Sequence, residues 1–154
     1  MAPHGAGPVG SRALTSLRIE TGYGSWGREY SPEYWPQECG LDGLVRSDKD
    51  FLNREACLRA LRQPAREVLR VLEVRATSAD ATGGEPIFDA EGKPAGKVSS
   101  GAYGYHVGKS LALAYLRPEI APGTALEVMI LGRPHGATVL DGAPFDPAGR
   151  RLRG

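Results

Sequence analysis

The sequence has few of the side chains that build metal centres and disulfide frameworks. It contains two cysteines and three histidines among 154 residues. Cys39 and Cys57 stand alone rather than in a metal-ligand spacing, and the histidines at 4, 106 and 135 are scattered. A zinc site or a disulfide scaffold would need closely spaced ligands or several cysteine pairs. We therefore expect no metal centre and two reduced core thiols.

The chain also lacks an excess of charge and any long apolar run. Nineteen basic against eighteen acidic side chains leave a formal charge of +1, which gives no electrostatic support to a nucleic-acid partner. No apolar stretch approaches the roughly 20 residues that span a bilayer. The first five residues carry neither the basic nor the apolar segment of a secretory signal. We expect a soluble, cytoplasmic protein with no nucleic-acid and no membrane partner.

Two helices are predicted before Pro64. The first runs from about residue 11 and ends at Gly22, with three apolar side chains on one face: Ala13, Leu14 and Leu17. That face should pack either on the rest of the chain or on a region upstream. Asn53 is a suitable N-cap for a second helix over 54–62, and a short extended piece is expected at 44–46.

After Pro64 the pattern changes to extended structure. Apolar and charged residues alternate toward the end of 68–75, which predicts the first strand. Turn-rich pieces separate the five further candidates, which are 85–88, 96–102, 110–116, 125–131 and 137–140. Short strands without helices between them indicate an antiparallel barrel or sandwich. The predicted fold class is thus α+β, with a short helical segment before a small antiparallel β domain.

The chain is organised around the stretch at 17–29, which joins the first helix to a turn rich in glycine and aromatic residues. Arg18 and Glu20 project about 200° apart on a helix, so each needs its own partner. Glycines around Tyr23 and Trp26 allow a sharp turn and a close approach to a flat ligand. The pattern fits a site for a planar ligand. The same residues also fit the simpler interpretation of an exposed arginine, a structural glutamate and two core aromatics.

Two apparent catalytic motifs fail on spacing. The segment 104–110 ends in Gly-Lys-Ser, but it has three residues where a phosphate-binding loop needs four. We therefore interpret it as a glycine-rich β turn. Ser99 and Ser100 do not lie in the Gly-x-Ser-x-Gly elbow of a hydrolase, so no nucleophile is assigned.

Three blocks of the sequence occur in the order seen in one known family. The first is Gly10-x-x-Ala13-Leu14-x-x-Leu17-Arg18-x-Glu20-x-Gly22, followed by Trp26-Gly27. The second joins 36–41 to 49–52, and the third joins 96–101 to 109–115. Together they resemble the folate-dependent aminomethyltransferase family, which includes the glycine cleavage T-protein and the C-terminal regions of dimethylglycine and sarcosine dehydrogenases. The turn at 102–110 is more similar to the dehydrogenase-linked members.

The resemblance implies a division of the chain near residue 64. Residues 1–64 would be the incomplete C-terminal end of a folate-binding domain, and 65–154 a C-terminal antiparallel β-barrel. The family's aspartate near the reacting folate nitrogen and its glutamate that grips the pterin lie upstream of the block containing Arg18. The chain would therefore contain no catalytic residue and be inactive alone.

The same resemblance implies roles for four residues in binding tetrahydrofolate. Arg18 matches the family arginine near the folate, and Trp26 stands where an aromatic residue, often tyrosine, borders the pocket. Glu20 either lines the pocket or braces a neighbouring turn, and Tyr23 either packs or contacts the ligand. The chain departs from the family pattern at two positions: Trp26 lacks the hydroxyl of the usual tyrosine, and Asn53 replaces the usual glycine.

The implied partners are folate, a small amine substrate and the missing upstream region of the same protein. A lipoyl carrier protein or a flavin domain would be a further partner, with FAD on a missing N-terminal domain. The intact protein would transfer a one-carbon unit from an amine to tetrahydrofolate. The alternative is a non-catalytic folate-binding or docking module of the same fold.

Overall fold

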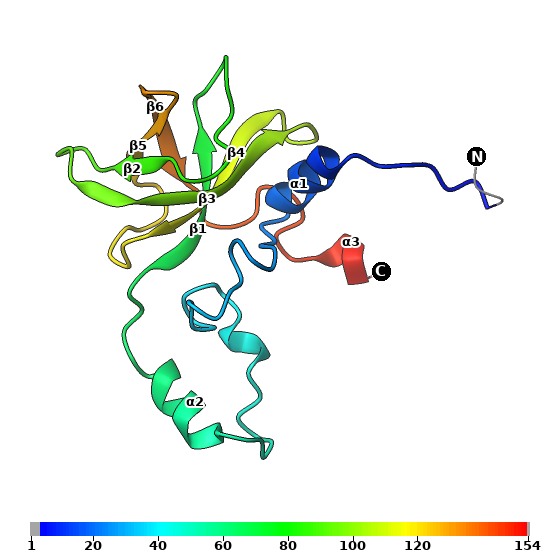
Figure 1. Ribbon diagram of the computed structural model, residues 1–154, viewed down its shortest axis with the longest axis vertical. Helices are drawn as coiled ribbons and strands as arrows, with labels where there is room; N and C mark the ends of the chain where they lie inside the picture. Colours follow the sequence, from blue (N-terminus) through cyan, green and yellow to red (C-terminus); the bar gives the residue numbers. More distant parts are fainter. Residues whose placement is uncertain (1–3, 154) are drawn as a thin grey trace.

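The computed structural model describes residues 4–153, apart from the side chain of residue 152. A β-barrel forms one end of the molecule, and a long loop carrying a short helix extends from it (Figure 1). The elements in chain order are α1 (Ser11–Glu20), the 3-10 helix η1 (Asp42–Leu44), α2 (Arg54–Leu61), β1 (Val68–Val74), β2 (Pro86–Phe88), β3 (Pro94–Gly104), β4 (Lys109–Leu116), β5 (Ala125–Ile130), β6 (Arg133–Val139) and α3 (Arg150–Arg153).

The six strands form a closed barrel in the order β1-β4-β3-β2-β5-β6, and every pairing is antiparallel. Leu72 of β1 pairs with Val139 of β6, which closes the ring. The predicted α+β fold and its antiparallel β domain are confirmed, and closure decides for the barrel over the sandwich. Predicted and observed strand ends differ by one or two residues except at β6, which begins at Arg133 rather than at 137. Pro134 and Gly136 indicate a turn, but a strand tolerates them next to a tight connection.

Strand β4 is buried on both faces. Ala112, Ala114 and Leu116 belong to the cluster inside the barrel. Leu111 and Leu113 point to the opposite face, where they pack with Ile19 of α1. Since side chains alternate across a strand, a helix on the outer wall accounts for the continuous apolar run in β4.

Helix α1 packs on β3 and β4 with a different face from the one predicted. Leu14 and Leu17 are 61% and 58% exposed, whereas Ser16, Ile19 and Glu20 are buried. Ser16 Oγ donates a hydrogen bond to the Tyr103 carbonyl at 2.7 Å. The helix therefore meets the barrel through polar contacts and one isoleucine, which an apolar spacing pattern does not reveal.

The loop between α1 and β1 differs from prediction at two points. The expected extended piece at 44–46 is wrong, because Leu44 ends a 3-10 helix. Asn53 does occupy the N-cap position of α2, but its side chain makes no capping hydrogen bond. Its backbone is left-handed, with φ of 61°. Asparagine tolerates this conformation better than most residues, which explains how it can stand where the resembling family has glycine.

Candidate functional site

A fully buried carboxylate, Glu29, lies where the 22–30 turn meets the barrel. Its Oε1 accepts hydrogen bonds from the hydroxyls of Ser99, at 2.7 Å, and Ser100, at 2.6 Å. Its Oε2 accepts from the backbone N–H of Ser25, at 2.9 Å, and from Arg18 Nη1, at 3.1 Å. The side chain thus joins three segments of the chain: α1, the turn and β3.

The backbone of Glu29 is held as well, because the Tyr115 hydroxyl of β4 donates to the Glu29 carbonyl at 2.6 Å. Nearby, Gly24 leaves room for this arrangement. A Cβ added at Gly24 would lie 2.7 Å from both Glu29 Cβ and the Tyr30 ring. The turn therefore requires glycine at this position to bring Glu29 against the barrel.

These contacts decide the charge of Glu29. Burial opposes ionisation, but hydrogen bonds from Ser100, Ser99 and the Ser25 N–H, together with the charge of Arg18, outweigh it and hold the pKa of Glu29 below its ordinary value of 4.5. Glu29 is therefore a carboxylate at neutral pH.

Arg18 is the partner of this carboxylate. Its Nη1 also donates to the Tyr23 carbonyl at 3.2 Å, and its Nη2 donates to Ser100 Oγ at 2.7 Å. The side chain is 13% exposed. The exposed-arginine interpretation is wrong, since Arg18 connects α1 to Glu29 and to β3.

Glu20 has separate partners, at the turn between β3 and β4. One oxygen, Oε1, accepts from the backbone N–H groups of His106, at 2.7 Å, and Val107, at 3.1 Å. The side chain is buried. Glu20 therefore braces this turn, and the turn itself is the glycine-rich β connection predicted for 104–110.

Tyr23 and Trp26 lie on the surface. Their exposed fractions are 49% and 78%, so the interpretation of both rings as core residues is wrong. Trp26 begins a tight loop closed by a hydrogen bond from Gly27 N–H to the Tyr30 carbonyl, at 2.8 Å. The four predicted residues thus come from one segment, and a hydrogen bond joins Arg18 to the Tyr23 carbonyl.

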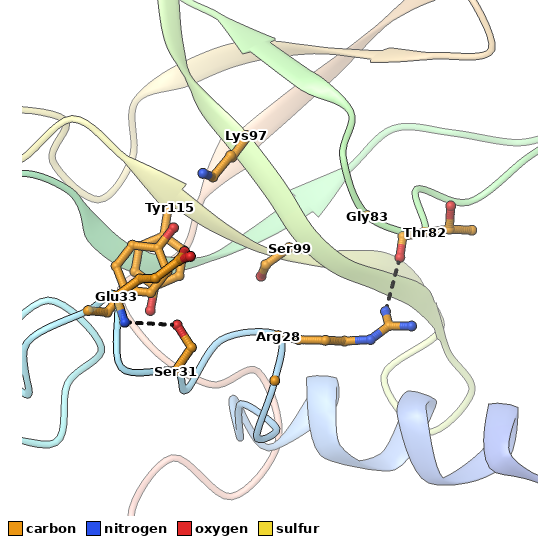
Figure 2. A pocket seen from close by; sticks show the side chains of 10 residues that line it. Arg28, Ser31, Glu33, Thr82, Gly83, Lys97, Ser99 and Tyr115 are labelled. Carbon is orange, nitrogen blue, oxygen red and sulfur yellow. Dashed lines mark hydrogen bonds between the residues drawn. The ribbon is translucent and has the colours of Figure 1, made fainter.

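Beside this cluster lies a cleft of about 670 Å³ between the 27–34 loop and β3 (Figure 2). Ser99 stands in its middle, with Lys97 toward one end and Arg28 toward the other. Arg28 Nη1 donates to the Thr82 carbonyl at 3.4 Å. Aromatic rings form one wall, because Tyr34 stacks on Tyr115 with centroids 3.8 Å apart. Ser99 therefore links the cleft to the Glu29 carboxylate.

Sequence reasoning did not single out Glu29 as a site residue, although it lies within the stretch at 17–29. Ser99 and Ser100 were noticed only as a failed hydrolase motif. The available signal was a pair of adjacent serines on a predicted strand, together with Arg18 and Glu20, two charged residues of the first helix that cannot pair with each other. That signal becomes specific only when the barrel brings residues about 70 positions apart together.

Within residues 4–153, no group of three or more histidine, cysteine, aspartate or glutamate side chains is arranged to hold a metal ion. Among the same residues, no helix has the length and apolar character needed to cross a membrane. Both cysteines are free thiols; Cys39 is buried and Cys57 is half-buried.

The protein is a closed antiparallel barrel with α1 and the Arg18–Glu29 pair packed on its outer wall. A family model described as "Glycine cleavage T-protein C-terminal barrel domain" matches residues 68–146, and one described as "GCVT N-terminal domain" matches residues 1–49. The chain belongs to the glycine cleavage T-protein family, which also contains dimethylglycine dehydrogenases.

Individual relatives agree with this family. The chain is 34% identical to mitochondrial dimethylglycine dehydrogenase of Mus musculus over 97% of its own length and 18% of that protein. It is 35% identical to an aminomethyltransferase of Saccharopolyspora erythraea over 85% of its length and 36% of that protein. The solved glycine cleavage system aminomethyltransferase T of Bartonella henselae superposes with a TM-score of 0.76 and 25% identity, covering 86% of this chain and 38% of that one. The chain thus spans well under half of these relatives.

Proposed function

We propose that this chain is the C-terminal part of a tetrahydrofolate-dependent aminomethyltransferase-like protein. The intact protein transfers a one-carbon unit from an amine to tetrahydrofolate. The observation that carries the proposal is the family match over the barrel and α1, combined with the small share of each relative that the chain covers. Residues 1–64 are then the end of a folate-binding domain, and 65–154 the C-terminal barrel.

The described residues fit a folate ligand in chemical terms. Arg18 offers a guanidinium that binds carboxylates or the polar edge of a ring. Trp26 and Tyr23 present exposed flat faces on which a ring system can stack. Glu20 holds the turn at 105–107 through backbone N–H groups. When bound, tetrahydrofolate supplies the nitrogen that accepts the one-carbon unit.

In this proposal the chain's residues work by positioning. Proximity of two reactants supplies a large part of the rate enhancement in transfers between bound groups. Proton transfer at the reacting nitrogen belongs to an upstream carboxylate, so the isolated chain is inactive. The uncovered apolar residues of α1, Leu14 and Leu17, support this interpretation, because an upstream region would bury them.

In the intact protein, the choice of donor amine and any oxidation step depend on residues or domains other than those of this chain. A preceding flavin domain with FAD would make the protein an oxidative demethylating enzyme, and a lipoyl carrier protein would be the partner of a stand-alone transferase. The cytoplasmic location expected from the sequence stays a prediction, and the mouse relative carries the word mitochondrial in its name.

The test compares this chain with a version extended upstream through its gene to the length of the aminomethyltransferase relatives. We expect tetrahydrofolate binding and one-carbon transfer from the extended protein and no transfer from the short one. Transfer by the short chain would contradict the proposal. Binding without transfer in the extended protein would favour the non-catalytic folate-binding or docking module. Arg18→Ala in the extended protein should weaken folate binding, and unchanged affinity would remove Arg18 from the pocket.

A further inference from the structure

The guanidinium of Arg18 is held on one side and free on the other. An arginine carries five N–H donors. Three of them are used, two by Nη1 toward Glu29 and the Tyr23 carbonyl and one by Nη2 toward Ser100. The Nε–H and the second Nη2–H have no hydrogen-bond partner within residues 4–153.

Those two remaining donors lie on the same edge of the planar group. Nη1 donates to Glu29 and Nη2 donates to Ser100, which itself donates to Glu29, so the edge between Nη1 and Nη2 faces this pair. The Nε–H and the Nη2–H beside it then form a fork on the other edge. Such a fork matches a pair of acceptor atoms in one plane, as in a carboxylate. The Arg18 side chain as a whole retains 13% exposure, so it is not sealed off from solvent.

The held side is fixed by groups that cannot easily move. Glu29 is fully buried and receives three further hydrogen bonds, from Ser25 N–H, Ser99 and Ser100. Ser100 contacts both the carboxylate and Arg18 Nη2, at 2.6 and 2.7 Å. Rotation of the guanidinium would break the ion pair and leave buried polar atoms without partners, which is costly.

We propose that Glu29 and Ser100 are positioning residues that hold the Nε–Nη2 edge of Arg18 toward a two-acceptor edge of the folate ligand. This inference rests on the proposed function. A role in stability alone is a weaker account, because a buried ion pair gives little net stabilisation over an apolar pair. Positioning also accounts for the three serine contacts, which fix the direction of the carboxylate.

The two-acceptor edge has two sources in a folate, the glutamyl carboxylates and the pterin ring. Binding is therefore measured with 5-formyltetrahydrofolate and with a tetrahydropterin that lacks the glutamyl part, using the upstream-extended protein. The variants are Glu29→Gln, Ser100→Ala and Glu29→Asp. The control is Glu38→Gln, since Glu38 is an equally buried glutamate paired with an arginine, Arg66, outside the cluster.

We expect Glu29→Gln to weaken 5-formyltetrahydrofolate binding by about tenfold or more, the scale of one charge-assisted hydrogen bond. Ser100→Ala should weaken it by a smaller factor, Glu29→Asp should recover part of the loss, and Glu38→Gln should leave it within about twofold of wild type. If the pterin probe loses affinity in parallel, the edge recognised is the ring. If only the glutamyl-bearing probe does, it is a carboxylate.

A second readout uses the present chain and needs no ligand. Nitrogen-15 NMR should show slow rotation of the Arg18 guanidinium, with separate Nη proton signals that merge in Glu29→Gln. Should the wild-type extended protein bind folate and Glu29→Gln and Ser100→Ala bind it equally well, the positioning role is overturned while the proposed function stands. Failure of the wild-type extended protein to bind either probe overturns both.

Discussion

The Ser16 hydroxyl donates to the Tyr103 carbonyl, and this contact lies on the face of α1 that meets the barrel. Three residues along the helix, Ile19 is fully buried against Leu111 and Leu113. Leu17, on another side of the same helix, remains 58% exposed. Ile19 and Leu17 have similar size and lie within one helical turn, but only Ile19 is placed to stabilise the fold by burial.

We predict that Ile19→Ala lowers the free energy of unfolding by about 2–5 kcal/mol, the range for removing a fully buried aliphatic side chain. Leu17→Ala should change it by at most about 0.5 kcal/mol, as at other exposed positions. Urea unfolding followed by circular dichroism measures both. The reverse order would mean that the predicted apolar face is the one packed on the barrel.

We predict that replacing Gly101 by alanine lowers the free energy of unfolding, because there is no space for a Cβ atom at this position. A Cβ added there would collide with the Ala81 carbonyl oxygen. Over-packing of this kind costs about 1–3 kcal/mol or more. Gly43→Ala is the matched control, because nothing lies within 4 Å of a Cβ at that position. Thermal and urea unfolding should show a large loss for Gly101→Ala only, and equal losses would contradict the packing seen at Ala81.

The barrel was predictable because each strand carries its own signal. In β1, for example, Leu72 and Val74 point inward while Glu73 lies between them. The position of α1 was not predictable, because its buried face contains Ser16 and Glu20, whose partners lie in β3 and in the turn after it. Polar residues become buried only when tertiary structure supplies hydrogen bonds.

The same limit applies to the site. Helix geometry indicated that Arg18 needs a partner other than Glu20, but it could not show that this partner is Glu29. A turn around Gly24 folds that carboxylate back, and the barrel supplies Ser99 and Ser100 from about 70 residues further along the chain. The folate contacts expected for Arg18, Glu20, Tyr23 and Trp26 stay predictions.

Ser100→Ala should destabilise the chain. Its hydroxyl is fully buried and contacts both members of the Arg18–Glu29 pair. Removing it leaves a buried charge short of one hydrogen bond, which costs about 1–3 kcal/mol. Ser78→Ala, at an exposed position, is the control. Chemical denaturation in parallel checks this, and a Ser100→Ala variant as stable as the control would mean that water or a neighbour replaces the hydroxyl.

Acid should weaken the fold through Glu38 and Glu29. Hydrogen bonds from Arg66, opposed by burial, lower the pKa of Glu38 from 4.5 to about 2. The pKa of Glu29 is also below 4.5, because hydrogen bonds and Arg18 outweigh the effect of burial. Both carboxylates have a higher pKa in the unfolded chain than in the folded one. The free energy of unfolding therefore rises with pH over the range in which the unfolded chain binds more protons than the folded chain. Both contributions are present above pH 4.5. That of Glu38 is lost as the pH falls toward about 2, and that of Glu29 as the pH falls through its own lowered pKa.

We therefore expect the free energy of unfolding to decrease steadily between pH 4.5 and pH 2, and to decrease less steeply in Glu38→Gln, which has no carboxylate to titrate at that position. At neutral pH the same variant should already be less stable by about 2 kcal/mol, because charge-assisted hydrogen bonds to Arg66 are lost. Urea titrations at several pH values give both quantities. If wild type and Glu38→Gln showed the same slope, Glu38 would have equal proton affinities in the folded and unfolded chains, and its ion pair with Arg66 would contribute nothing to the acid response.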